Sequence, residues 1–147
     1  MMTINRVTPS DIPALRDMLY ALCAYHGDTC TRGLENIHAQ FIDGPLIGLI
    51  ARKGVAAIGF ATLVTHWRPM KDGDSIDILH LYVADGLRGQ GIGRQLIAAA
   101  QSHARRFGAT RLTIGTSPDN PGAAQAYRAM GWDEITAHPG PRFQIAL

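Results

Sequence analysis

Apolar residues recur along this chain in short runs, and their spacing separates expected strands from expected helices. Alternation of apolar and polar residues, the pattern of a half-buried strand, opens the chain. Further on, the pair Lys53-Gly54 joins two strand-like runs as a hairpin. We expect strands at residues 2–7, 46–52, 55–65, 76–84, 111–115, 132–135 and 143–147.

Other segments carry apolar residues every three to four positions, which is the period of a helix. The first of them starts with Thr8 as the N-cap and Pro9 in the first turn, a combination that favours a helix start. We expect helices at residues 9–25, 34–41, 91–107 and 120–130. Strands and helices interleave without an internal repeat or a linker, so the sequence predicts one mixed α/β domain over residues 1–147.

The composition supports a single globular domain. The 147 residues are 46% hydrophobic and 18% charged, and the net charge is +2. No basic run indicates a nucleic-acid surface, and no apolar stretch reaches the ~20 residues that span a bilayer. Cys23 and Cys30 lack the spacing of metal ligands. Because the start of the chain shows no signal-peptide pattern, we expect a cytoplasmic protein with reduced thiols and with no metal, nucleic-acid or membrane partner.

The strongest chemical signal is a glycine-rich turn between an expected strand and an expected helix. The strand ends in Leu81-Tyr82-Val83, and the turn reads Arg88-Gly89-Gln90-Gly91-Ile92-Gly93. Free backbone N–H groups and the positive end of the helix dipole converge at such a turn, and glycine lets an anion approach the backbone closely. With Arg88 and Arg94 adding positive charge, the turn predicts a phosphate-binding site.

Two common phosphate loops do not fit this turn. A Walker loop ends in Gly-Lys-Ser/Thr, whereas this chain has Gly93-Arg94-Gln95. A dinucleotide fingerprint needs a third glycine at the position that Arg94 occupies. The ligand therefore belongs to another class of phosphate compound.

The turn resembles the acyl-CoA signature of the GNAT N-acetyltransferase superfamily, Arg/Gln-x-x-Gly-x-Gly/Ala, here Arg88, Gly91 and Gly93. A second pattern, Asn120-x-x-Ala123-x-x-x-Tyr127-x-x-x-Gly131-Trp132, is similar to the motif on the fourth helix of that family. Both patterns stand in the family's order with a strand between them. The resemblance covers essentially the whole chain, as in a small single-domain bacterial-type member.

The resemblance implies an α/β (α+β) GNAT fold. In it, a mixed, mostly antiparallel central sheet of about seven strands is flanked by four helices, with a splay between the fourth and fifth strands. The backbone of Leu81, Tyr82 and Val83 would pair with the pantetheine arm of acetyl-CoA, the co-substrate. The residues implied at its pyrophosphate and nearby are Arg88, Gly89, Gln90, Gly91, Ile92, Gly93, Arg94, Asn120 and Tyr127. Asn120 before Pro121 also has the pattern of a helix N-cap, and the two roles are compatible.

Tyr127 is the candidate general acid. Attack of an amine on a thioester expels a thiolate, and a phenol with a pKa of about 10 can protonate a thiolate whose thiol has a pKa near about 8.5. Helical spacing also places Tyr127 on one face with Ala123 and Met130, so a packed core aromatic is the alternative.

The family often places its general base, a carboxylate, on the strand before the turn. That position is Leu79 in this chain, so this carboxylate is missing. Strand alternation places Asp77 on the same face as Leu79 and Leu81, which makes Asp77 the candidate base, acting through a water, with solvent as the alternative. The same alternation directs His80 to the opposite face, as a packed histidine.

In this family the acceptor is selected by the first two helices and by the loop before the fourth strand. The candidate residues there are Tyr25, Asp28, Trp67 and Asp74, since carboxylates and an aromatic wall suit a cation. We expect direct transfer to a primary amine of a small molecule: a polyamine, an amino acid or an aminoglycoside-like compound. A protein N-terminus or lysine as acceptor, and a non-catalytic acetyl-CoA-binding module, are the alternatives. Monomer and homodimer both stay open.

Overall fold

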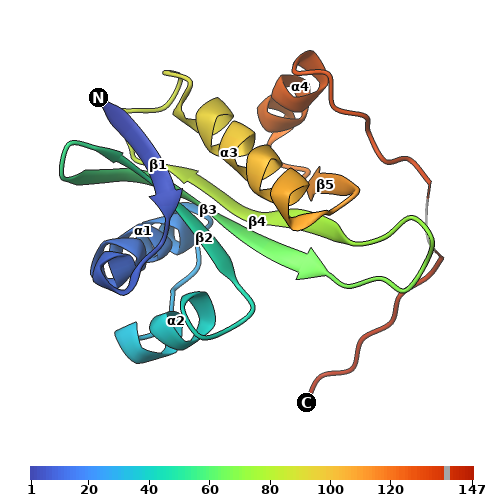
Figure 1. Ribbon diagram of the computed structural model, residues 1–147, viewed down its shortest axis with the longest axis horizontal. Helices are drawn as coiled ribbons and strands as arrows, with labels where there is room; N and C mark the ends of the chain where they lie inside the picture. Colours follow the sequence, from blue (N-terminus) through green and yellow to red (C-terminus); the bar gives the residue numbers. More distant parts are fainter. Residues whose placement is uncertain (138–139) are drawn as a thin grey trace. The chain divides into compact units, whose positions relative to one another are not determined.

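The chain divides into two compact units, Met1–Gly115 and Thr116–Leu147. The computed structural model describes residues 1–137 and 140–147 (Figure 1). Each unit is described by itself. In the part of the chain that is described, every helix is too short or too polar to cross a membrane. Whether the two units form one domain, as the sequence predicts, stays a prediction.

The larger unit is built on a sheet with the strand order β1-β2-β3-β4-β5. Neighbouring strands from β1 to β4 are antiparallel, whereas β5 runs parallel to β4. The strands are β1 (Met2–Arg6), β2 (Ile47–Lys53), β3 (Ala56–His66), β4 (Ser75–Val83) and β5 (Arg111–Ile114). The helices of this unit are α1 (Ile12–Tyr25), which follows the 3-10 turn η1 (Pro9–Asp11), α2 (Leu34–Phe41) and α3 (Ile92–Phe107). All of them lie within a few residues of the segments expected from the sequence.

Helices cover both faces of this sheet: α3 lies on one face, and α1 and α2 lie on the other (Figure 1). A Cβ placed on Gly59 of β3 would lie 3.3 Å from Leu96 of α3, so Gly59 faces α3. The next residue, Phe60, is fully buried in a cluster with Leu15 of α1 and Phe41 of α2. Burial of apolar side chains on both faces stabilises the three layers.

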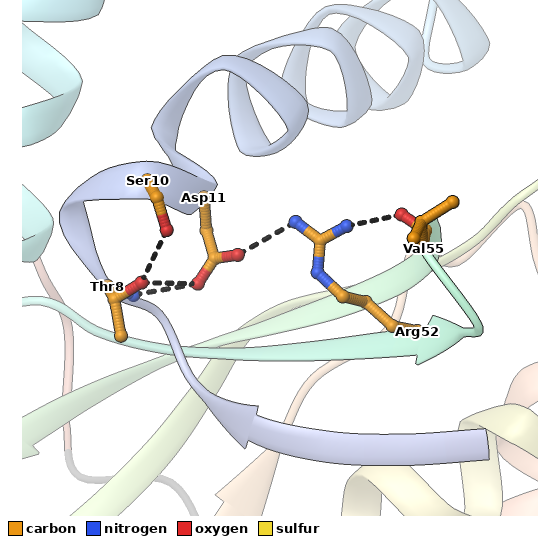
Figure 2. A network of polar contacts seen from close by, with 5 residues as sticks. All are labelled: Thr8, Ser10, Asp11, Arg52 and Val55. Atoms are coloured by element: carbon orange, nitrogen blue, oxygen red, sulfur yellow. Dashed lines mark hydrogen bonds and ion pairs between the residues drawn. The ribbon is translucent and has the colours of Figure 1, made fainter. Parts of the chain in front are cut away.

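A polar network attaches the start of α1 to the β2–β3 hairpin (Figure 2). One carboxylate oxygen of Asp11 accepts hydrogen bonds from the N–H of Thr8 at 2.9 Å and from its hydroxyl at 3.0 Å. The other accepts from Arg52 Nη2 at 2.7 Å, and Arg52 Nη1 donates to the carbonyl of Val55 at 2.7 Å. The helix start expected from Thr8 is therefore also a tertiary anchor.

A β-bulge interrupts β4 at Leu79. On the β3 side, Thr62 pairs with His80 and Leu63 pairs with Ile78, which leaves Leu79 without a partner. On the β5 side, pairing ends at Ile78. Residues 79–83 therefore form an edge that is open on the β5 side, where the family resemblance implies that the fourth and fifth strands part.

The bulge changes which β4 side chains share a face. Partners across a ladder share a face, and β3 pairs Val64 with Asp77 and Thr62 with His80. Because Thr62 and Val64 are two residues apart, Asp77 and His80 lie on one face and Leu81 lies on the other. The expectation that Asp77 shares a face with Leu81 and opposes His80 was wrong, because the extra residue of the bulge shifts the alternation by one.

The smaller unit contains α4 (Pro121–Ala129). Asn120 Oδ1 accepts a hydrogen bond from the N–H of Ala123 at 3.2 Å, so Asn120 is the N-cap that the sequence predicts. After the helix, the N–H of Trp132 donates to the carbonyl of Tyr127 at 3.1 Å. The turn that closes α4 thereby holds Trp132 against the last turn of the helix.

The expected strands at residues 132–135 and 143–147 are not formed in the described part of this unit, so the sheet has five strands and not about seven. Phe143 and Ile145 are 92% and 84% exposed, so their alternation with polar residues does not mark a buried face. A strand is stable only with a hydrogen-bonded partner, and a short alternating run does not specify one.

Candidate functional site

The open edge of β4 is the first part of the candidate site. In an antiparallel ladder, every second residue directs its backbone N–H and carbonyl groups to the same neighbouring strand. The N–H of Ala84 donates to the carbonyl of Ile58 on the β3 side at 2.9 Å, so the backbone groups of Tyr82, two residues earlier, also face β3. Leu81 and Val83 then direct their N–H and carbonyl groups to the opposite edge, where no β5 residue pairs with them. An extended ligand can pair with these groups in the manner of an added strand.

The segment after β4 forms a cradle of backbone N–H groups. Gly89 and Gly91 have φ values of +79° and +84°, a conformation that favours glycine, and a Cβ on either would meet no described atom within 4 Å. The first hydrogen bond of α3 runs from the N–H of Gln95 to the carbonyl of Gly91 at 3.1 Å. The N–H groups of residues 91–94 are thus left at the positive end of the helix, beside open space. The cradle fits an anion such as a pyrophosphate.

The Arg88 side chain connects the open edge to the end of α1. Its Nε donates to the carbonyl of Val83 at 3.1 Å, and its Nη1 lies 3.4 Å from Asp85 Oδ1. Its Cζ lies 4.7 Å from the centre of the Tyr25 ring, a cation–π contact. A ligand that pairs with Val83 would replace the guanidinium at that carbonyl. Arg94 is exposed in the first turn of α3.

A cavity of about 440 Å³ lies between α1, α2 and β4. Its lining is mostly apolar, and the polar part comes from a few residues of α2, of the segment before it and of β4. The lining residues are Leu19, Leu22, Cys23, Cys30, Arg32, Asn36, Ile37, Gln40, Phe41, Leu46 and His80. Burial, with a smaller effect of Cys30, raises the pKa of the Cys23 thiol, so Cys23 stays protonated near neutral pH and is a weak nucleophile.

His80 reaches this cavity because of the bulge at Leu79. Its ring packs edge-on against Phe60, with 6.4 Å between the ring centres. Nδ1 is buried and has no hydrogen-bond partner among the described residues. Burial, with a smaller effect of His26, lowers the pKa of His80 below the ordinary value of 6.5, so the ring is neutral at pH 7. Sequence reasoning missed His80 in this position because a bulge leaves no mark on the hydrophobic pattern.

Asp77 is held by the neighbouring strand. Its Oδ1 accepts a hydrogen bond from the hydroxyl of Thr113 on β5 at 2.7 Å. Asp77 and Thr113 are also partners in the parallel ladder, so their side chains share a face. The contact gives Asp77 a structural partner and leaves its role as a base a prediction.

The four predicted acceptor residues lie in different places. Tyr25 is at the end of α1, in contact with Arg88. Asp28 accepts a hydrogen bond from the N–H of Thr29 at 2.7 Å. Trp67, which is 77% exposed, and Asp74, which accepts from the N–H of Arg68 at 2.8 Å, lie in the loop between β3 and β4. That loop precedes β4 and the glycine turn follows it, so Trp67 and Asp74 lie at the other end of β4, whereas Tyr25 contacts Arg88 of the turn.

In the smaller unit, Tyr127 is half-buried on α4, and its ring centre lies 6.2 Å from that of Trp132. Burial raises the pKa of Tyr127, so its hydroxyl stays protonated well above neutral pH. Tyr127 and the glycine turn belong to different units, so their meeting stays a prediction. Among residues 1–137 and 140–147, no group of three or more ligating side chains could hold a metal ion.

Comparison with known proteins identifies the family. Residues 14–132 match the model of the "Acetyltransferase (GNAT) family". Aminoglycoside N(6')-acetyltransferase type 1 of Salmonella typhimurium is 30% identical over 92 residues, which cover 60% of this chain and 63% of that protein. The match thus spans less than two thirds of the relative's length.

Solved structures share the fold. AAC(6')-Iy in complex with the bisubstrate analogue CoA-S-monomethyl-acetylneamine has a TM-score of 0.82 at 21% identity, with 99% of both chains covered. A ribosomal-protein-alanine N-acetyltransferase from Brucella melitensis has a TM-score of 0.79 at 19% identity, with 97% of this chain and 100% of that chain covered. At these identities the likeness shows the fold alone. Because the family model covers most of its residues, this chain belongs to the acetyltransferase (GNAT) family.

Proposed function

We propose that this protein is an acetyl-CoA-dependent N-acetyltransferase that moves the acetyl group directly to a primary amine of a small molecule. The observation that carries the proposal is the succession of an open strand edge at residues 79–83 and an N–H cradle at residues 88–94. A pantetheine arm needs extended backbone partners, and the pyrophosphate attached to it needs an anion site next to them. Family membership and the name of the Salmonella relative support the same function.

In the proposed reaction, the amine nitrogen attacks the thioester carbonyl carbon, a C–N bond forms, the C–S bond breaks and CoA leaves as a thiolate. The free N–H groups of Leu81 and Val83 lie where a backbone donor could stabilise charge on the carbonyl oxygen. A raised thiol pKa at Cys23 argues against an acetyl-cysteine intermediate. These features favour direct transfer.

Two residues are proposed for the proton transfers. Tyr127 would protonate the leaving thiolate, and burial supports this role because the raised pKa of Tyr127 keeps its hydroxyl protonated. Asp77, acting through a water, is the residue that the sequence predicts to accept a proton from the amine. Its hydrogen bond with Thr113 fixes the carboxylate but does not select between this role and a structural one.

The experiment that tests the proposed function measures CoA thiol release from acetyl-CoA with single amines. The panel contains a polyamine, an amino acid, an aminoglycoside and a peptide with a free N-terminus. We expect turnover with at least one small amine and none without an amine. Acetyl-CoA binding without turnover would make the protein a binding module, and turnover with the peptide alone would assign the acceptor to proteins.

A further inference from the structure

The apolar cavity between α1, α2 and β4 indicates which amines this protein accepts, if the proposed transferase function holds. Five of its lining residues are large aliphatic or aromatic side chains: Leu19, Leu22, Ile37, Phe41 and Leu46. No Asp or Glu is among the described residues that line it. Each ammonium group of an aminoglycoside or polyamine that entered would lose its hydration without gaining a carboxylate partner, which is costly. The lining therefore disfavours a polycation.

The polar part of the lining suits an anionic group. Arg32 contributes a guanidinium group, and Asn36 and Gln40 of α2 contribute amide groups. A guanidinium matches the two oxygens of a carboxylate, and amide N–H groups can donate to them. The backbone of Arg32 is fixed, because its carbonyl accepts a hydrogen bond from the hydroxyl of Tyr20 on α1 at 2.9 Å.

His80 provides a proton acceptor in the same cavity. Nδ1 is enclosed and has no partner among the described residues, whereas His80 as a whole is only partly buried and lines the cavity. Nε2 is therefore the nitrogen that can meet a ligand. His80 also lies two residues beyond Ile78, the last β4 residue that pairs with β5, so it is part of the open edge proposed for the thioester arm.

We propose that this cavity receives the acceptor, an apolar primary amine with a single carboxylate, and that His80 Nε2 takes the proton of the attacking amine. The carboxylate lies at Arg32, and the apolar body lies among the leucines and Phe41. The volume of about 440 Å³ falls in the range of small-molecule sites, roughly 300–1,000 Å³. An amino acid with a large apolar side chain has this chemistry.

The protons balance as follows. The acceptor loses one proton to solvent to become a neutral amine, and a second passes to His80 Nε2 as the C–N bond forms. The thiolate gains one proton, so one proton is released in total. The titratable and charged groups around His80 and its cavity are Cys23 on α1, His26 and Asp28 after it, Cys30 and Arg32 in the segment before α2, and Asp77 on the same face of β4, while α2 lines the cavity with amides.

A binding experiment tests the cavity without relying on catalysis. Cys23 and Cys30 are the only cysteines of the chain, and both line the cavity, so a bound ligand should shield them from iodoacetamide. We expect L-phenylalanine or 8-aminooctanoate at saturation to slow alkylation at least about fivefold, and spermidine or neamine to leave the rate unchanged. In the variant Arg32→Gln the protection should be lost. In the control Arg105→Gln, at an exposed arginine at the end of α3, it should remain.

Steady-state kinetics then test whether His80 is the general base, with His103 as the control. His103 on α3 resembles His80 in its partial burial, its lowered pKa and one enclosed nitrogen without a partner, but it does not line the cavity. We expect His80→Gln to lower kcat by about 10²-fold and to remove the acidic limb of the pH–rate profile, and His103→Gln to change neither. If His80→Gln does not fold, Asp77→Asn decides, since the acidic limb should remain in that variant when His80 is the base.

The outcomes separate this inference from the proposed function. Turnover of spermidine or neamine without turnover of apolar amino acids would overturn the inference and leave the transferase function standing. Protection by L-phenylalanine without turnover of any amine would support the cavity assignment and refute the transferase function. Loss of the acidic limb in Asp77→Asn but not in His80→Gln would give the base role to Asp77.

Discussion

At the scale of single residues, Tyr127 has two candidate roles, that of a packed aromatic and that of the general acid. It shares a helix face with Ala123 and Met130, and it lies beside Trp132, as a packed aromatic would. Its hydroxyl is the group that distinguishes the two roles. A packed ring needs only its apolar surface, whereas a general acid needs the proton.

We predict that Tyr127→Phe keeps the thermal stability and acetyl-CoA affinity of the wild type and lowers kcat by roughly 10²-fold. The substitution preserves the ring and removes the proton donor. Steady-state kinetics and thermal unfolding check this together. Retained kcat with a lowered Tm would show that Tyr127 is a packed residue.

At the scale of elements, the position of α1 determines the shape of the acceptor cavity, and the Asp11–Arg52 pair helps to fix it. The side chains of Asp11 and Arg52 are 12% and 26% exposed, so the pair is better shielded from solvent than a surface ion pair. Loss of one partner would leave the other charge partly buried and unpaired. The anchor should therefore contribute measurably to stability.

We predict that Asp11→Asn lowers the free energy of unfolding by about 1–3 kcal/mol in urea denaturation. The control Asp17→Asn removes a carboxylate that is 74% exposed and 3.5 Å from Arg16, and it should change stability by less than about 0.5 kcal/mol. Equal effects of the two substitutions would show that the Asp11 network is not an anchor.

The same anchor has a defined pH dependence. Burial alone would raise the pKa of Asp11, but hydrogen bonds from Thr8 and Arg52 outweigh it and hold the pKa below the ordinary value of 3.8. The stabilisation is thus complete above pH 3.8 and is lost as the pH falls through the lower, folded-state pKa. Asp11→Asn should remove this part of the acid sensitivity.

The sequence predicted the positions of the helices and strands better than the irregularity within β4. Periodicity located α1 to α4 and β1 to β5 because each has a face that is at least partly buried or a strong cap, such as Thr8 or Asn120. The glycine turn was also predictable, because the backbone at Gly89 and Gly91 has a positive φ that favours glycine. The bulge at Leu79 was not, since it depends on the register against β3 and no residue type signals it. The positions of Asp77 and His80 were therefore mispredicted.

At the scale of the whole molecule, the account depends on acetyl-CoA binding along the edge of β4 and the turn after it. The Arg88 side chain donates to the carbonyl of Val83 and makes a cation–π contact with Tyr25, so a ligand that pairs with Val83 would displace a group that contacts both the edge and the end of α1. The cradle itself depends on Gly91, the N-cap of α3, where the backbone is left-handed and the space around it is open. A side chain there would occupy the place proposed for the phosphate.

Calorimetric titration of acetyl-CoA into Gly91→Ala and Gly108→Ala tests this claim most directly. The two glycines flank α3 with φ values of +84° and +90°, and a Cβ on either meets no described atom within 4 Å, so the backbone strain should be similar, about 1–2 kcal/mol. Only Gly91 lies in the proposed cradle. We expect at least a tenfold loss of acetyl-CoA affinity, about 1.4 kcal/mol, in Gly91→Ala and wild-type affinity in Gly108→Ala. Equal affinity of the two folded variants would contradict the account.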